Sequence, residues 1–222
     1  MCLLSHIVGD VNHKSYLILS SDDAIPLLKQ MKNIPNLTPS FIREKLAHYK
    51  RRIINKNTLT ESAVLIPIVK RENRMELLFT KRSETVEHHK GQISFPGGAT
   101  DNADFSPVDT ALRESLEEIG LERSAISILG VMDDLQTPTG FVVTPVVGFI
   151  QQLPSLRINP EEVSQVIFVP LEKFFDDGLR HSTMRERDGI MVEIFSYEVW
   201  EEPIWGATAF FVKQLINLLQ DA

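Results

Sequence analysis

The sequence predicts a mixed α/β (α+β) fold, in which helices pack against a central β-sheet. Three observations support this class. Apolar runs of strand length recur from Ser62 onward, polar turn residues separate the first two runs, and two later stretches carry apolar residues at helical spacing. Strands and helices arranged in this way build domains in which the sheet and the helices share a core. We find no internal repeat and no low-complexity tract.

The chain is predicted to consist of an N-terminal appendage, residues 1–36, and one domain over residues 37–222. Its 222 residues, 43% of them hydrophobic, are enough to bury a core of ordinary size. Within the appendage, residues 16–19 are a candidate strand and residues 22–31 a candidate helix.

The first helix of the domain is predicted to begin at Thr38 and Pro39. Thr38 can cap the helix, and Pro39 suits its first position, where no backbone donor is needed. One helical face would carry apolar residues for the core: Ile42, Leu46, Tyr49 and Ile53. The basic residues 50–52 are interpreted as favourable charge at the helix C-terminus or as a solvated face, in preference to a ligand site.

The next elements are predicted strands. Residues 63–69 and 76–82 are apolar runs joined by a polar turn at residues 70–74, so they form a candidate hairpin. Two helical segments are expected, one near residues 107–119 and one at residues 206–219. Further candidate strands lie at residues 125–133, 141–150, 165–170 and 190–200.

The helix near residues 107–119 carries the most informative side chains. Ser106 can cap this helix, and Gly120 stands where helices commonly end. The spacing of its glutamates places Glu114 beside both Glu117 and Glu118 on one edge of the helix.

Three neighbouring carboxylates repel one another unless a cation lies among them. A divalent metal is the obvious compensation, because magnesium prefers oxygen ligands and is commonly shared between a few carboxylates and substrate phosphates. Arg113, four residues before Glu117, can offset part of the charge. For an isolated E-x-x-E-E pattern, a solvated acidic helix face would be the better interpretation. The surrounding residues reverse that preference.

Those residues resemble the Nudix box, G-x5-E-x7-R-E-U-x-E-E-x-G-U, in which U is aliphatic. The matching positions are Gly98, Arg113, Glu114, Glu117, Glu118, Gly120 and Leu121. Asp104 stands at the first glutamate, eight residues instead of seven separate it from Arg113, and Ser115 replaces an aliphatic residue. The resemblance implies the Nudix fold, with a mixed central β-sheet sandwiched between α-helices, and an enzyme that hydrolyses a diphosphate.

The resemblance also implies roles for the matching residues. Glu114 and Glu118 are expected to bind Mg²⁺ (or Mn²⁺), with Glu117 as a further ligand or as a base. Arg113 is expected to orient this cluster, and Gly98 to offer its backbone carbonyl to the metal. A metal-activated water would attack one phosphorus, and the metal would offset the charge on the bridging oxygen that leaves.

A second resemblance concerns the substrate. Residues 77–98, LLFTKRSETVEHHKGQISFPGG, are similar to the additional signature of the coenzyme A pyrophosphatase branch, approximately L-L-T-x-R-S followed by G-x3-F-P-G-G. Residues 135–150 and 201–211 also resemble that branch. This resemblance implies hydrolysis of coenzyme A or acyl-CoA to 3′,5′-ADP and (acyl-)4′-phosphopantetheine.

Coenzyme A carries a diphosphate and a 3′-phosphate, so its site needs cationic side chains. Lys81, Arg82 and Lys90 are the candidate substrate-binding residues, and Arg82 is favoured because guanidinium can bind phosphate bidentately. Solvated charge is an equally good interpretation of Lys81 and Lys90. Glu162 resembles the further catalytic carboxylate that Nudix enzymes often take from a loop beyond the box, with a solvated loop charge as the alternative.

Composition argues against several other classes of protein. A net charge of −7 and a pI near 5.4 oppose nucleic-acid binding and leave a small nucleotide as the expected partner. No segment approaches the ~20 apolar residues of a membrane span, and the first ten residues do not match a signal peptide. With Cys2 as its one cysteine, the chain forms no internal disulfide. We therefore expect a cytoplasmic protein without membrane partners; the sequence leaves a homodimer open.

Two competing functions stay open at this stage. The first is a Nudix hydrolase for another nucleoside diphosphate derivative, such as ADP-ribose or a dinucleotide. The second is a Nudix-fold binding module without catalysis. The intact Glu114, Glu117 and Glu118 argue against the second, because a pure binder has no evident need for clustered carboxylates.

Overall fold

A mixed β-sheet lies at the centre of the computed structural model, which describes residues 37–55, 58–85, 90–187 and 189–220. The predicted appendage, residues 1–36, with its candidate strand and helix, lies outside these ranges. Within them, eight strands form the central sheet. They are β1 (Thr60–Arg71), β2 (Arg74–Arg82), β3 (Ile93–Ser94), β4 (Gly97–Ala99), β5 (Ser127–Val131), β6 (Leu135–Gln136), β7 (Phe141–Ile150) and β8 (Val163–Pro170).

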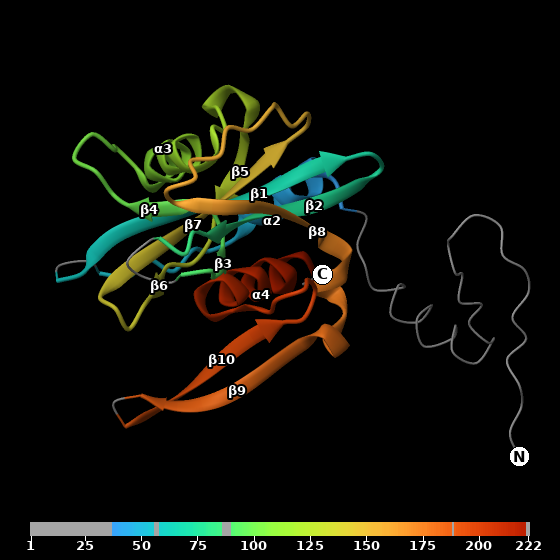
Figure 1. Cartoon of the computed structure of the whole chain (residues 1–222). Coiled ribbons are helices and arrows are strands. Elements are labelled where there is room, and N and C mark those ends of the chain that lie inside the picture. Colours follow the sequence, from blue (N-terminus) through green and yellow to red (C-terminus); the bar gives the residue numbers. More distant parts are fainter. Residues whose placement is uncertain (1–36, 56–57, 86–89, 188, 221–222) are drawn as a thin grey trace, which may run out of the picture. The chain divides into compact units, whose positions relative to one another are not determined.

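The central sheet is built around two long neighbours, β1 and β7 (Figure 1). Its main path runs β3-β2-β1-β7-β5, and β4, β6 and β8 pair with β1, β7 and β2 respectively. Strands β1 and β7 are parallel, whereas the other pairs are antiparallel. The predicted hairpin is confirmed as β1 and β2, with Arg71 opposite Arg74. The apolar run predicted at residues 141–150 is β7.

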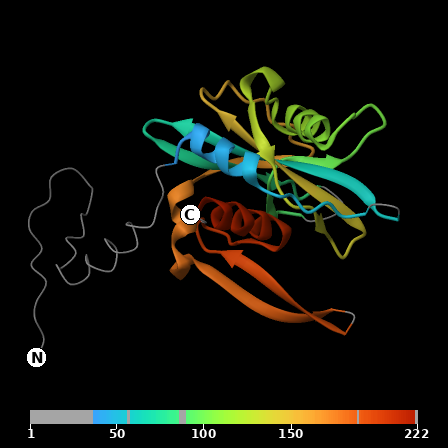
Figure 2. The same ribbon diagram turned by 180° about the vertical axis from the view of Figure 1, so that it is seen from behind.

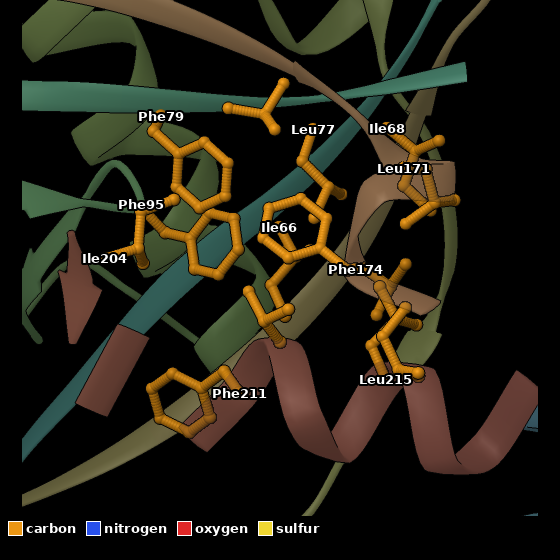
Figure 3. Packing of buried hydrophobic residues seen from close by; sticks show 14 of the residues in the cluster. Ile66, Ile68, Leu77, Phe79, Phe95, Leu171, Phe174, Ile204, Phe211 and Leu215 are labelled. Atoms are coloured by element: carbon orange, nitrogen blue, oxygen red, sulfur yellow. The ribbon is translucent and has the colours of Figure 1, made fainter. Parts of the chain in front are cut away.

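Helices cover both faces of this sheet, which confirms the predicted sandwich. One face packs against α3 (Pro107–Ile119), and the other against α2 (Pro39–His48) and α4 (Gly206–Gln220). Because side chains alternate along a strand, Leu65 of β1 lies in the α3 core and Ile66 lies in the α4 core. Figure 3 shows the α4 core, with Phe211 and Leu215 below Ile66 and Phe174. No helix in the described part of the chain is long and apolar enough to cross a membrane.

A second, antiparallel sheet follows the 3₁₀ helices η2 (Leu171–Phe175) and η3 (Asp177–Leu179). It comprises β9 (Arg180–Arg187), β10 (Ile190–Tyr197) and β11 (Ile204–Trp205) and lies beside α4 (Figure 1). Sequence patterns predict β10 but not β9, because the exposed β9 has few apolar residues to alternate.

The segment after α2 corrects two predictions. Thr38 caps the helix as predicted, its Oγ1 accepting from the Phe41 N–H at 3.1 Å, but the helix ends at His48 and Ile53 is 68% exposed. Arg51 is not a solvated charge, since its guanidinium donates to the buried carboxylate of Asp134. Beyond the helix, the backbone N–H groups of Arg52 and Ile54 donate to the carboxylates of Asp133 and Asp134 in the loop after β5 instead of to helical carbonyls. Figure 2 shows α2 beside that part of the sheet.

Candidate active site

Helix α3 begins and ends where its capping residues predict. Ser106 Oγ accepts from the Asp109 N–H at 3.3 Å and donates to Asp109 Oδ2 at 2.8 Å. At the other end, Gly120 takes the left-handed conformation, with φ of 67° and ψ of 25°, which glycine adopts without the penalty of a Cβ. Buried apolar residues such as Leu112 and Ile119 turn one side of the helix toward the sheet. The glutamates of α3 therefore lie along the edge of that packed side.

Glu118 is the most deeply buried of these glutamates. It is 3% exposed, and its Oε2 has no hydrogen-bond partner among the described residues. Burial, the largest cause, and the neighbouring charges of Glu114 and Glu162 together raise the pKa of Glu118 to about 8, although Arg82 and a backbone bond from Gly97 act in the opposite direction. A buried carboxylate with an unpartnered oxygen is costly unless a cation compensates it.

Gly98 leaves the space that Glu114 occupies. Strand β4 pairs with β1 so that Gly98 lies opposite Ala63. A Cβ at Gly98 would lie 2.5 Å from the carboxylate atoms of Glu114. Burial raises the pKa of Glu114, and its bond with Arg113 partly opposes this rise. Any larger residue at position 98 would therefore displace a predicted metal ligand.

Arg113 ties the cluster together. Its Nη1 donates to Glu114 Oε1 at 2.8 Å and to Glu117 Oε2 at 3.1 Å, and its Nη2 donates to the Ala99 carbonyl at 2.8 Å. Asp104 accepts from Arg113 Nη2 at 3.0 Å, and this bond holds the pKa of Asp104 below its ordinary value. Asp104 thus contacts Arg113 from the loop before α3, a loop that accommodates the extra residue in the box.

Ser115, the other departure from the box, lies in the core. Its hydroxyl donates to the Ala111 carbonyl at 2.7 Å, and the residue is fully buried. This bond satisfies the hydroxyl within the helix, so the position tolerates a small polar residue where the box has an aliphatic one.

Glu162 reaches the same cluster from the loop before β8. After burial and nearer charges, the charge of Glu162 adds to the raised pKa values of both Glu114 and Glu118. Glu162 Oε1 accepts from Asn159 Nδ2 at 3.2 Å, and the Asn159 N–H donates to the Glu118 carbonyl at 2.9 Å.

The three predicted phosphate-binding cations occupy different places. Arg82 lies on the face of β2 that carries Leu78 and points toward α3, and its charge acts on Glu118. Lys81 lies on the opposite face, where its Nζ donates to Glu202 Oε1. Lys90 is exposed between β2 and β3. Arg82 therefore acts on Glu118, whereas Lys81 is paired with Glu202.

The donor set fits the divalent cation that the motif implies. Glu114, Glu117 and Glu118 offer hard oxygen ligands, Gly98 stands against Glu114, and Glu118 has an oxygen without a partner in the described part of the chain. No group of three or more His, Cys, Asp or Glu side chains in that part of the chain is placed to hold a metal ion, so the carboxylates present no ready-made cage. Mg²⁺ needs no such cage, because it retains several waters and binds through one or two carboxylates and substrate phosphates.

Sequence patterns miss one residue of this site, Asn159, and the partner of another, Asp104. Asp104 has a partner, Arg113, that the spacing of the box does not reveal. Asn159 precedes Pro160, which signals a turn. Its contacts with Glu118 and Glu162 depend on where the loop docks on α3, and no local pattern specifies that docking.

The part of the chain that carries the site is similar to known proteins. The family model described as the NUDIX domain matches residues 59–190, a range that includes each site residue from Lys81 to Glu162. The uncharacterized Nudix hydrolase NudL of Escherichia coli (strain K12) is 40% identical over 166 residues, which cover 73% of this chain and 85% of that protein. NudL of Photorhabdus laumondii is 36% identical over 159 residues, covering 72% and 84%. The crystal structure of a Nudix hydrolase from M. smegmatis, RenU, aligns with a TM-score of 0.44 at 18% identity, over 51% of this chain and 72% of that one.

Proposed function

This chain belongs to the Nudix hydrolase family, and on that premise we propose that it hydrolyses the diphosphate of coenzyme A or of its acyl thioesters, with Mg²⁺ or Mn²⁺ as cofactor. The products are 3′,5′-ADP and 4′-phosphopantetheine or its acylated form. One observation carries the catalytic part of the proposal: Glu118 is buried with one carboxylate oxygen unpartnered among the described residues, and the carboxylate of Glu114, one helical turn away, lies against Gly98.

The residues of α3 and β4 would hold the metal. Glu114 and Glu118 are its proposed ligands, supplemented by Glu117 and by the backbone carbonyl of Gly98. When bound, the divalent ion supplies a Lewis acid that activates water and offsets charge on the diphosphate. Arg113 keeps Glu114 and Glu117 oriented through its two Nη1 bonds, so the carboxylates need little reorganisation when substrate arrives.

Hydrolysis needs a proton acceptor beside these ligands. Water attacks one phosphorus, the bond from that phosphorus to the bridging oxygen breaks, and the proton lost by water passes to a carboxylate. Glu162 is our proposed acceptor, because it reaches the cluster from outside the metal-binding helix and is held by Asn159. Glu117 is the second candidate, since it is more exposed than Glu114 and close to Arg113.

The substrate part of the proposal rests on residues 77–98. Their resemblance to the coenzyme A pyrophosphatase signature supports a ligand that carries a diphosphate and a further phosphate. Arg82 has the strongest structural support as a phosphate partner, because its charge lies within reach of Glu118 and its Nε is buried without a partner among the described residues. Lys81 would have to leave Glu202 to bind phosphate.

A substrate panel tests this function. The purified protein is incubated with Mg²⁺ and coenzyme A, acetyl-CoA, ADP-ribose or a dinucleoside polyphosphate, and the products are separated. We expect 3′,5′-ADP from the coenzyme A compounds. Cleavage of ADP-ribose alone would transfer the assignment to another nucleoside diphosphate, and binding without any cleavage would favour the non-catalytic module.

A paired substitution tests the metal ligands. Glu118→Gln should reduce turnover by ~100-fold or more, since residues that merely support metal ligands typically cost ~10- to 100-fold when replaced and a ligand should cost no less. The fold should persist, because Gln matches Glu in shape and the raised pKa already favours the neutral form. Glu122→Gln, on an exposed residue just beyond α3, is the control and should keep its turnover. Equal activity in both variants would refute the ligand assignment.

A further inference from the structure

The loop that carries Glu162 completes the C-terminal end of α3. The last carbonyls of a helix have no partner within the helix, and here the loop supplies donors for them. The Arg157 N–H donates to the Ile119 carbonyl at 2.9 Å, and the Asn159 N–H donates to the Glu118 carbonyl at 2.9 Å. Asn159 is therefore bonded directly to the backbone of a proposed metal ligand.

Asn159 also shapes the turn that leads to Glu162. Its carbonyl accepts from the Glu162 N–H at 3.2 Å and from the Val163 N–H at 2.9 Å. Its side-chain Oδ1 accepts from the Glu161 N–H at 3.2 Å. Because that backbone donor requires the oxygen of the amide, the Nδ2 end must face the other way. It donates to Glu162 Oε1 at 3.2 Å, where the carboxylate can only accept.

The backbone of Glu162 is held independently of this amide. The Ser83 N–H donates to the Glu162 carbonyl at 2.8 Å, and Thr85 Oγ1 donates to the Glu161 carbonyl at 3.1 Å. These bonds join the end of β2 to the start of β8. Loss of the Asn159 side-chain donor would therefore free the carboxylate of Glu162 without releasing its main chain.

We propose that Asn159 is a positioning residue, which sets the Glu162 carboxylate in a defined place relative to Glu118. One residue bonds to the Glu118 carbonyl through its backbone and to Glu162 through its side chain, so the spacing of the two carboxylates depends on a single short link. This inference rests on the proposed function in one respect, namely that Glu162 takes part in hydrolysis. It adds a residue outside the Nudix box to the determinants of turnover.

The experiment is a double-mutant cycle on kcat and KM. Asn159→Asp keeps the oxygen that accepts from Glu161 and replaces only the donor to Glu162 with a repelling carboxylate. We expect kcat to fall by ~10- to 100-fold, the usual effect of removing a residue that orients a reacting group, while KM changes by less than about threefold. In a Glu162→Gln background, Asn159→Asp should change kcat by less than about threefold, because its route of action has been removed.

The outcomes separate positioning from a structural role. If Asn159→Asp lowers kcat equally in the wild-type and Glu162→Gln backgrounds, Asn159 acts through the fold and the proposal is overturned. A wild-type kcat in Glu162→Gln or in Asn159→Asp would also overturn it. Ser155→Asp adds the same charge at an exposed position of the loop and should keep wild-type kcat. An equal loss of kcat in this control would also overturn the proposal, because general loop charge would explain it.

Failure of the proposed function can be told apart from failure of the role proposed for Asn159. If the protein cleaves a diphosphate other than coenzyme A, the substrate proposal fails, and the same cycle on that substrate tests Asn159. If it cleaves none, the crystal structure of Asn159→Asp decides. We expect the Glu162 carboxylate to leave residue 159 while the backbone of residues 159–163 stays in place. An unmoved carboxylate would overturn the inference.

Discussion

Replacing Gly98 with alanine is the most direct perturbation of the proposed metal site. The new Cβ would lie 2.5 Å from Glu114 Cδ, Oε1 and Oε2, whereas real Cβ contacts are essentially never shorter than 3.0 Å. The carboxylate must therefore retreat by at least about half an ångström, and by nearly 1 Å to reach ordinary contact at 3.4 Å. A misplacement of ~1 Å at a reacting centre can cost ~100-fold in rate. We expect kcat of Gly98→Ala to fall by that amount.

Stability should change little in the same variant. Gly98 does not occupy the left-handed region, so alanine suits its backbone. The reduced freedom of the unfolded chain stabilises by about 0.4–1 kcal/mol, and a strained Glu114 rotamer costs about 0.5–1.5 kcal/mol. Turnover, Mn²⁺ affinity by electron paramagnetic resonance and urea unfolding would measure the three effects separately.

Two other glycines provide the comparison. Gly178→Ala, far along the chain in η3, meets only the flexible Asp176 carboxylate at 3.1 Å and should keep full turnover. Gly97→Ala would place a Cβ 2.3 Å from the Ala63 carbonyl, a backbone atom of β1 that cannot move aside, and should prevent folding. If Gly98→Ala retains kcat within about threefold of the wild type, Glu114 does not need its present position and the reasoning is refuted.

Three further predictions concern stability. Arg51→Ala leaves Asp134, whose side chain is 0% exposed, without its cation, and should lower the free energy of unfolding by about 3–5 kcal/mol in urea; a loss below about 1 kcal/mol would contradict this. The bond from Arg113 lowers the pKa of Asp104 in the folded state, so in acid the unfolded state binds more protons than the folded state. The contribution of this bond to the free energy of unfolding is therefore complete above the ordinary aspartate pKa of ~4 and is lost as pH falls through the lowered value. Asp104→Asn should therefore flatten the acid limb of the urea stability profile, and an unchanged limb would count against the link. Finally, Mg²⁺ at about 100 times its Kd should raise the free energy of unfolding by about 2.7 kcal/mol in the wild type and much less in Glu118→Gln, as measured by thermal melting; equal gains would exclude Glu118 as a ligand.

Local sequence patterns predict the parts of the site that lie on one element. The positions of Ser106 and Gly120 define α3, and helical spacing alone places Glu114 beside Glu118. The β1–β2 hairpin likewise follows from two apolar runs and the turn between them. These features are predictable because their geometry depends on neighbours only a few residues away.

Contacts between distant segments required the tertiary structure. Strand alternation predicts that Lys81 and Arg82 face opposite sides of β2, but the docking of α3 decides which of them meets the glutamates. Arg51 belongs to a basic run with no visible acidic partner until the loop after β5 brings Asp134 to it.

By itself, the sequence determined the mixed α/β class, the acidic helix and its resemblance to the Nudix box. Only the tertiary structure decided that Asn159 links the loop carrying Glu162 to the end of α3. The physical reason is that spacing along a helix is set by backbone geometry, whereas the meeting of a helix end and a loop depends on sheet register, burial and the need of the last helical carbonyls for donors.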